Sequence, residues 1–355
     1  MIDGENMSDL AKRLRDKKAF AWNFDPAVSD VATWQRTTLA AVRNALGIGI
    51  GIGTIATPSA TPLAEWEDDG SFGQHLQLGF SNGETADAYL LRPSTKHPTP
   101  GILLFHDHGS FFSIGRQKLI RRPDEPLETA AQSNEWATRL YGGQHVGNVL
   151  ARRGYSVLCV DTLGWGGRSG TGYEGQQALA ANLLQFGQSL AGVVLQEDLE
   201  ALAFLKQLDG VDPERLASFG FSMGGARAWQ VAALSPDAKA CVSGGWMGTL
   251  SGLMQSGSNQ LRGQSAFYML HPGIAGRIDY PHLAALAAPK PALFFSGRDD
   301  RHFPEAIATD AFRQMRMIWD TTDAPNALHT RMVPGGHVFA VQQQDDAIDW
   351  LDRVL

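Results

Sequence analysis

The stretch that decides the fold is Gly220-Phe221-Ser222-Met223-Gly224, the only G-x-S-x-G pattern in the 355-residue chain. It lies between an apolar run and a stretch rich in small residues. A serine held on a sharp turn from a strand into a helix projects its hydroxyl outward, and the flanking glycines let the backbone turn without a clash. The stretch therefore predicts such a turn, with Ser222 as a nucleophile.

A serine hydroxyl is a weak nucleophile, so the chemistry needs two further side chains. An imidazole must take the hydroxyl proton, and a carboxylate must fix the tautomer and orientation of that imidazole. In this architecture both residues follow the serine, each after a later strand. Asp300 follows the apolar run at 291–297, and His337 follows the run at 328–335. We assign Asp300 as the acid and His337 as the base, with the adjacent Asp299 as the alternative acid.

Acyl transfer also develops an oxyanion, which backbone amides stabilise in this architecture. One amide belongs to the residue after the nucleophile, Met223. The second belongs to the loop after an earlier strand at 101–109, where we select His108. The helix that starts near Gly224 would add the positive end of its dipole. His108 is selected for its amide, so its imidazole could equally pack against neighbours or gate the site.

The order of the predicted elements indicates an α/β fold. A hairpin around Asn82-Gly83 starts the sheet, and the chain then alternates strands with helices up to an amphipathic helix at 345–355. We expect a mostly parallel, eight-stranded sheet with antiparallel N-terminal strands and helices on both faces. The predicted strands cover 75–81, 86–93, 101–109, 155–161, 216–221, 239–245, 291–297 and 328–335.

The first 66 residues differ from the rest and predict a helical extension (1–66) to a catalytic domain at 67–355. Asp30 is expected to cap a helix that ends at Gly47. The glycine-rich stretch at 47–53 lacks the third glycine and the preceding strand of a dinucleotide fingerprint. It therefore predicts no cofactor site.

Three long connections, at 109–147, 162–195 and 246–288, are predicted to open at the carboxyl ends of the strands, where such sheets bind ligands. We expect these loop insertions to form a cap over the site. Their large apolar side chains could line a substrate pocket or pack in the core, and the residues leave both interpretations open. The pocket candidates are Phe111, Trp165, Trp246 and Met247.

The composition favours an enzyme that acts on a small molecule. The net charge is -7 and the charges are interspersed, which argues against a nucleic-acid partner. The chain has no signal-like apolar run and no stretch of about 18 apolar residues, so we expect no membrane partner. Cys159 and Cys241 lie within apolar runs and are expected to be free buried thiols of a cytoplasmic protein. Homo-oligomerisation is left open.

Two clusters near the predicted site have alternative roles. His106 and His108 flank Asp107 in a pattern that could bind a metal, but no third ligand has metal spacing and a serine mechanism needs no cation. No metal or cofactor is therefore predicted. A basic loop could clamp an anionic substrate group, although we favour a solvated loop. Its members are Arg116, Lys118, Arg121 and Arg122.

Several segments resemble the α/β-hydrolase superfamily over about residues 70–355. Within it they resemble the dienelactone-hydrolase-like and acetyl-xylan-esterase-like bacterial hydrolases. The matching motifs are FHDHGSFF (105–112) with GRQK (115–118), YGGQHVGNVLARRGYSVLCVDTLGWGGR (141–168), VDPERLASFGFSMGG (211–225), APKPALFFSGRDDRHFP (288–304) and PGGHVF (334–339).

The resemblance implies a serine esterase that cleaves small acyl or acetyl esters, including those of carbohydrates, through an acyl-enzyme on Ser222. Dienelactone hydrolases use a cysteine nucleophile, so Ser222 makes an ordinary carboxylic ester the expected substrate. The chain is also similar to prolyl-oligopeptidase-type peptidases around GFSMGG, which keeps a peptidase or amidase as one alternative, although the N-terminal segment is too short for their propeller. A non-catalytic ligand-binding protein on the same fold is the other alternative.

Overall fold

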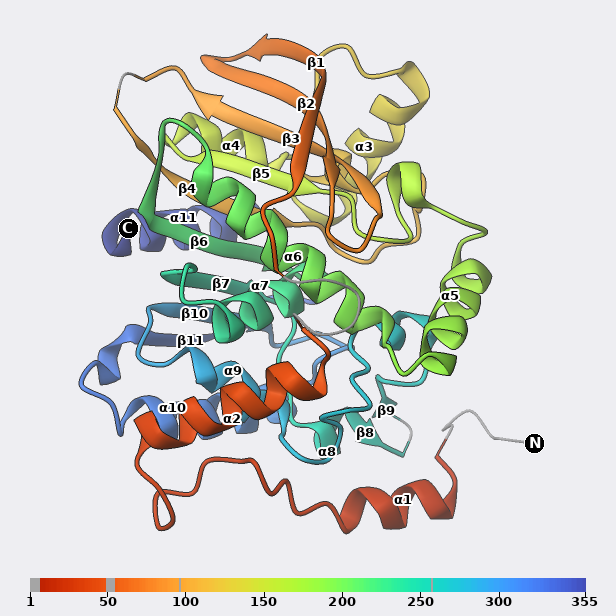
Figure 1. Cartoon of the computed structure of the whole chain (residues 1–355), viewed down its shortest axis with the longest axis vertical. Helices are drawn as coiled ribbons and strands as arrows, with labels where there is room; N and C mark the ends of the chain where they lie inside the picture. Colours follow the sequence, from red (N-terminus) through yellow and green to blue (C-terminus); the bar gives the residue numbers. More distant parts are fainter. Residues whose placement is uncertain (1–6, 49–54, 96, 257) are drawn as a thin grey trace.

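The computed structural model describes residues 7–48, 55–95, 97–256 and 258–355 (Figure 1). Its centre is a sheet with nine strands within these ranges, in the order β1-β2-β3-β5-β4-β6-β7-β10-β11. The strands are β1 (Ser59–Asp68), β2 (Ser71–Gly79), β3 (Thr85–Pro93), β4 (Thr99–Phe105), β5 (Ser156–Val160), β6 (Val211–Phe221), β7 (Ala240–Gly244), β10 (Ala292–Gly297) and β11 (Leu328–Val333). A small ribbon joins β8 (Met254–Gln255) to β9 (Ser258–Asn259).

Strand direction divides the sheet into two parts. The first three strands are antiparallel to their neighbours, and β3 joins the rest through an antiparallel pairing with β5. From β5 to β11 every neighbouring pair is parallel. The carboxyl ends of β4, β6, β10 and β11 therefore lie at one edge, where open α/β sheets bind their ligands. The predicted α/β fold with a mostly parallel sheet is confirmed.

The described sheet has one strand more than the eight that the sequence predicts. The additional strand is β1, which lies across the predicted boundary at residue 66, so that boundary falls inside a strand. Most of its residues are exposed and Trp66 is the one buried side chain. Polar and apolar residues alternate only in two short pieces of β1, because its pairing with β2 shifts register between Pro62 and Ala64. This interruption, at an exposed edge, hides the strand in the sequence.

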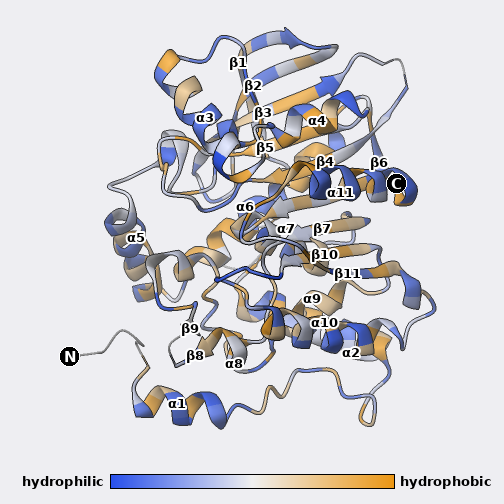
Figure 2. Ribbon diagram, turned by 180° about the vertical axis from the view of Figure 1, so that it is seen from behind, coloured by the Kyte–Doolittle hydropathy of each residue, from blue (hydrophilic) through white to orange (hydrophobic). Residues whose placement is uncertain are grey.

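Helices cover both faces of the sheet (Figures 1 and 2). On one face lie α2 (Val31–Ala45), α6 (Leu190–Gln207), α7 (Met223–Leu234), α9 (Tyr280–Ala284) and α10 (Glu305–Trp319), and on the other α3 (Leu127–Leu140), α4 (Val146–Arg152) and α11 (Val341–Val354). Alternate side chains of one strand point to opposite faces of the sheet. Leu103 of β4 packs in the core beneath the first group of helices, and Leu104 packs in the core beneath the second group. Figure 2 shows the central strands as predominantly hydrophobic.

The N-terminal segment packs on this same body. It contains α1 (Asp9–Asp16) and α2, which begins as predicted, because the Asp30 carboxylate accepts a hydrogen bond from the Thr33 amide at 2.8 Å. Val42 of α2 is fully buried in the core that also contains α6 and α7. Most of the glycine-rich stretch at 47–53 lies outside the described residues.

The three predicted connections carry most of the remaining elements. The first contains η1 (Arg116–Lys118) and α3 and ends at the start of α4. The second contains η2 (Gly166–Arg168) and α5 (Tyr173–Gln185), and the third contains α8 (Leu250–Leu253), η3 (Gln264–Tyr268), α9 and η4 (Ala285–Ala287). The second and third connections pack together. The Tyr268 hydroxyl donates to the Leu163 carbonyl oxygen at 2.8 Å, and the ring centroids of Tyr268 and Trp165 lie 4.9 Å apart.

Within the described ranges, no helix taken singly has both the length and the apolar composition needed to cross a membrane. The helices α5 and α6 meet this requirement only as a pair, bent by 92°.

Buried histidines make the stability of this fold depend on pH. Burial lowers the pKa of His108, His145, His271 and His282 to about 4, and holds that of His106 well below its ordinary value. In the unfolded chain these imidazoles bind protons below about pH 6.5. Between about pH 6.5 and 4 the unfolded state therefore binds more protons than the folded state, and stability falls as the pH falls.

We expect His271→Gln to flatten this dependence. The ring of His271 is buried, and its Nε2 lies 2.7 Å from Oε1 of Gln230, a contact that a glutamine donor can replace. The histidine accounts for about 3 kcal/mol of the loss between pH 6.5 and 4. Urea unfolding at several pH values measures how the free energy of unfolding changes with pH. We expect the slope of this dependence to fall, in the variant, by the equivalent of about one bound proton. An unchanged slope would show that His271 titrates normally in the folded protein.

Candidate active site

The predicted strand-to-helix turn is present at Ser222. Strand β6 ends at Phe221, Ser222 has φ 57° and ψ -128°, and α7 begins at Met223. A positive φ is costly for a residue with a side chain, so the surroundings must hold this conformation. The Ser222 amide helps to do so by donating to the carbonyl oxygen of Gly244 on β7 at 2.8 Å.

The two glycines of the motif are required by close backbone contacts. A Cβ on Gly224 would lie 2.1 Å from the carbonyl oxygen of Phe105, at the end of β4. A Cβ on Gly220 would lie 2.2 Å from the carbonyl oxygen of Gly224. The turn therefore sits directly against the loop that follows β4, and this contact brings the two predicted oxyanion segments together.

We expect Gly224→Ala to destabilise the protein by more than about 3 kcal/mol, because backbone cannot move aside as a flexible side chain can. Activity should be lost with it. Gly170→Ala is the matched control, since its Cβ would meet nothing closer than 3.9 Å. Thermal unfolding of both variants measures the difference, and an equal melting temperature would contradict the role given to this contact.

The structure brings Ser222, His337 and Asp300 together. The Ser222 Oγ lies 2.8 Å from Nε2 of His337, and Nδ1 of the same ring lies 2.7 Å from Oδ2 of Asp300. The Asp300 side chain is buried, and its Oδ1 accepts hydrogen bonds from the amides of His302 and Phe303 at 2.8 and 3.3 Å. These contacts fix the carboxylate and, through it, the imidazole.

The electrostatics of Asp300 suit an ionised acid. Burial alone would raise the pKa of its carboxyl, but the hydrogen bond and charge of His337 and the two backbone donors outweigh burial and lower the pKa. The neighbouring Asp299 is exposed, and its amide donates to the carbonyl oxygen of Gly335. Of the two candidate acids, the structure thus places Asp300 against His337.

A second histidine, which the sequence analysis does not identify, lies beside the first. The rings of His302 and His337 meet edge to face with centroids 4.8 Å apart. Burial, followed by the nearby charge of His337, lowers the pKa of His302. The sequence could have indicated His302 by its position two residues after Asp300, on the same loop after a predicted strand.

The two residues selected for their amides lie on the same cavity as Ser222. Met223 is the first residue of α7, so its amide is among those that a helix leaves without an intrahelical partner. His108 follows β4 on the loop that packs against the turn. Its imidazole lies in a cluster of aromatic rings. The imidazole centroid is 4.9 Å from the ring centroid of Trp165 and 5.6 Å from that of Tyr173.

The cavity at Ser222 has a volume of about 500 Å³. Of the four predicted pocket residues, Trp246 lines it. Trp165 and Met247 are instead buried in the core, and Phe111 packs against the ring of Trp136. The lining consists of Asp107, His108, Gly109, Ser110, Trp136, Arg139, Leu140, Tyr173, Ser222, Met223, Trp246, Gln260, Leu261, Ser265, Ala266, Met269, His302, Phe303, His337 and Val338.

All three connections predicted to form a cap contribute residues to the lining of the cavity. Trp136 and Arg139 come from the first, Tyr173 from the second, and Trp246 and Met269 from the third. Aromatic and polar side chains therefore line the cavity at Ser222. Such a mixture suits a small organic ligand that presents both apolar surface and hydrogen-bonding groups.

The basic residues that follow β4 are mostly paired with acidic side chains, and two of them are buried. Arg116 is buried and paired with Asp161, and Lys118 is fully buried. Arg121 and Arg122 form ion pairs with acidic side chains at 2.9 and 2.6 Å. The prediction of a solvated loop is therefore wrong for the first two residues, whose charges are neutralised inside the protein.

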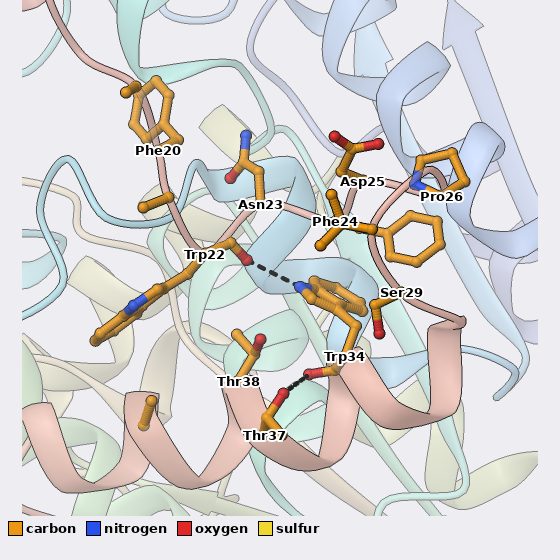
Figure 3. Close-up of a pocket in the computed structure, with 14 residues that line it drawn as sticks. Phe20, Trp22, Asn23, Phe24, Asp25, Pro26, Ser29, Trp34, Thr37 and Thr38 are labelled. Atoms are coloured by element: carbon orange, nitrogen blue, oxygen red, sulfur yellow. Dashed lines mark hydrogen bonds between the residues drawn. The ribbon is translucent and has the colours of Figure 1, made fainter.

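A second, larger hollow of about 770 Å³ lies in the N-terminal segment (Figure 3). It is lined by residues 19–26, 28 and 29 and by the facing side of α2, and the Trp34 indole donates to the Trp22 carbonyl oxygen across it at 2.9 Å. It shares no lining residue with the cavity at Ser222. Its described lining residues include no serine beside a histidine, unlike the lining of the cavity at Ser222.

The described residues contain no group of three or more histidine, cysteine, aspartate and glutamate side chains that could hold a metal ion. His106 is buried, and its two ring nitrogens contact the carbonyl oxygen of Asp107 and the amide of Thr162.

Comparison with known proteins places these features in a wider group. The family model of the dienelactone hydrolase family matches residues 140–349, which include all three residues of the Ser222 hydrogen-bonded chain. YtaP of Bacillus subtilis, named as a hydrolase, is 27% identical over 281 residues, or 79% of this chain and 87% of its own.

Solved structures share the fold at low sequence identity. A Bacteroides fragilis protein named as an acetyl xylan esterase matches with a TM-score of 0.68 at 16% identity, covering 94% of this chain and 84% of its own. A glucuronoyl esterase from Solibacter usitatus matches with a TM-score of 0.64 at 13% identity, covering 94% and 96%. The similarity therefore extends over nearly the whole chain, including the N-terminal segment.

Proposed function

Because the chain belongs to the dienelactone hydrolase family, we propose that it is a serine hydrolase that cleaves carboxylic esters through an acyl-enzyme on Ser222. The observation that carries the proposal is the continuous hydrogen-bonded chain from the Ser222 hydroxyl through His337 to Asp300, with links of 2.8 and 2.7 Å. This arrangement can remove a proton from a hydroxyl and hold the resulting imidazolium.

In the first half of the reaction, the Ser222 Oγ attacks the acyl carbonyl carbon while Nε2 of His337 takes the hydroxyl proton. Asp300 holds Nδ1–H and stabilises the imidazolium. The tetrahedral oxyanion accepts hydrogen bonds from the amides of Met223 and His108. When it collapses, the bond to the alcohol oxygen breaks and His337 returns the proton to that oxygen, which leaves as the free alcohol.

In the second half, water replaces the alcohol. His337 takes a proton from the water as its oxygen attacks the acyl carbon, a second oxyanion forms in the same place, and its collapse breaks the bond to Ser222 Oγ. The proton returns to Oγ and the carboxylic acid is released. No group other than these side chains, the two amides and water takes part in the balance.

We propose small acyl or acetyl esters, including those of carbohydrates, as the substrates. The support is the cavity of about 500 Å³, whose lining combines Trp136, Tyr173, Trp246 and Phe303 with polar side chains. Two proteins of similar fold carry the names acetyl xylan esterase and glucuronoyl esterase. A serine nucleophile also favours an ordinary ester over a dienelactone.

Hydrolysis of matched esters and amides tests this proposal. The wild-type protein should release p-nitrophenol from the acetyl ester faster than from longer acyl esters, and should liberate acetate from an acetylated xylose oligomer. It should leave a proline p-nitroanilide intact. Faster cleavage of the anilide would favour the peptidase alternative, and binding of ester without turnover would favour the non-catalytic one.

We also propose that the protein works in a reducing, cytoplasmic compartment. Both Cys159 and Cys241 are free and buried, and burial raises the pKa of each thiol, which keeps it protonated and inert. Cell fractionation would test the proposal, and recovery of the protein outside the cytoplasmic fraction would contradict it.

A further inference from the structure

Lys118 is fully buried next to the loop that provides the His108 amide. It ends the short turn η1, and its ammonium donates to the carbonyl oxygen of His108 at 2.8 Å and to that of Asp107 at 3.3 Å. Its charge is balanced by the Asp107 carboxylate, with Nζ 3.8 Å from Oδ2. A buried ammonium is costly unless its donors are used, so these contacts fix its position.

The carbonyl of Asp107 and the amide of His108 belong to one planar peptide group. Because the peptide is trans and planar, its C=O and N–H point in opposite directions, and a donor bound to the oxygen sets the direction of the N–H. Lys118 thus holds one side of the peptide whose other side is the proposed oxyanion donor.

His106 holds the same oxygen from a second direction. Its Nε2 accepts a hydrogen bond from the Thr162 amide at 3.1 Å, so the ring proton must be on Nδ1. Nδ1 lies 2.9 Å from the Asp107 carbonyl oxygen and therefore donates to it. Burial and the nearby charge of Lys118 lower the pKa of His106, which keeps the ring neutral and in this tautomer.

The Asp107 carboxylate also fixes the position of this loop. Oδ1 of Asp107 accepts hydrogen bonds from Nε1 of Trp136 at 3.0 Å and from the hydroxyl of Tyr141 at 2.5 Å. Gly109 has φ 48°, and a Cβ on it would lie 2.4 Å from the Trp136 ring. The peptide between Asp107 and His108 therefore cannot turn without breaking several buried contacts.

We propose that Lys118 and His106 are positioning residues for the oxyanion hole, because together they orient and polarise the Asp107–His108 peptide so that its amide donates to the oxyanion on the substrate. Two donors on a carbonyl oxygen draw electron density from the peptide and strengthen its N–H as a donor. This inference rests on the proposed esterase function and extends it to residues that do not touch the substrate.

The chain offers a matched control in Lys290. Its ammonium also donates to two carbonyl oxygens, those of Ala232 at 2.7 Å and Ser235 at 2.5 Å, and burial lowers the pKa of both lysines to about 8. These carbonyls lie at the opposite end of α7 from Ser222. Lys290→Met therefore removes the same kind of contact from a place without an oxyanion donor.

The experiment compares Lys118→Met with Lys290→Met on p-nitrophenyl acetate and on a trifluoromethyl ketone, which forms an oxyanion adduct with the serine. We expect Lys118→Met to lower kcat by about 10²-fold with little change in KM, at the lower end of the loss for one oxyanion donor. Ketone affinity should fall by a similar factor. Lys290→Met should lower the melting temperature without changing kcat or ketone affinity.

A second pair of variants decides the matter if Lys118→Met does not fold. His106→Asn retains a donor near the position of Nδ1 and should keep most of kcat, whereas His106→Leu should lose it with KM unchanged. Equal losses in the two lysine variants, unchanged ketone affinity in Lys118→Met, or equal activity of the two His106 variants would overturn the inference. A wild-type protein that neither cleaves esters nor binds the ketone would overturn the proposed function itself, and this role with it.

Discussion

Replacing Ser222 with alanine is expected to lower kcat for ester hydrolysis by about 10⁶-fold, because it removes the atom that attacks the carbonyl. The substitution removes one oxygen, whose hydrogen-bond partner is Nε2 of His337. The backbone contacts of the turn, including the bond from the Ser222 amide to Gly244, do not depend on the side chain. Stability should therefore change by less than about 1 kcal/mol.

Steady-state kinetics and thermal unfolding of the same preparation measure both expectations. Ser94→Ala is a suitable control, since Ser94 is exposed just beyond the end of β3 and should leave both quantities unchanged. Activity of Ser222→Ala within about tenfold of the wild type would require another nucleophile, and the mechanism would be wrong.

The second large effect is expected at Asp300. In Asp300→Asn the amide group would face Nδ1 of His337 and favour the tautomer with its proton on Nε2, which cannot accept the serine proton. We expect kcat to fall by about 10⁴-fold. Because the side chain is buried and also accepts two backbone hydrogen bonds, some loss of stability should accompany it.

Asp299→Asn is the matched control, since it makes the same chemical change one residue earlier. Asp299 is exposed, so its substitution should alter stability by no more than about 0.5 kcal/mol and leave kcat near the wild-type value. Kinetic constants of the two variants, measured side by side, distinguish the two acids. A larger loss in Asp299→Asn than in Asp300→Asn would reverse the assignment.

The parts of the fold that the sequence predicts are those governed by local rules. The parallel strands are continuous apolar runs because they are buried on both faces, and the turn at Ser222 has glycines because backbone approaches them closely. Asp300 and His337 could be selected because their positions after parallel strands place them at one edge. Sequence separation is unimportant for residues that a sheet gathers in this way.

The parts that could not be predicted depend on packing between distant segments. The edge strand β1 has an alternating pattern that a register shift between Pro62 and Ala64 interrupts, and its pairing with β2 defines it. Trp165 and Trp246 look alike in sequence and are both buried, yet Trp246 lines the cavity and Trp165 does not. Lys118 belongs to a basic stretch that looks solvated, and its burial depends on an acid, Asp107, from the preceding loop.

The most direct test of the central claim is labelling with a fluorophosphonate, followed by mass spectrometry of the digested protein. Such reagents form a stable bond to a serine oxygen that a neighbouring base has activated. We expect one adduct per chain, on the peptide that contains Ser222, and no adduct in Ser222→Ala. An adduct on another residue, or esterase activity that persists in fully labelled protein, would contradict the account.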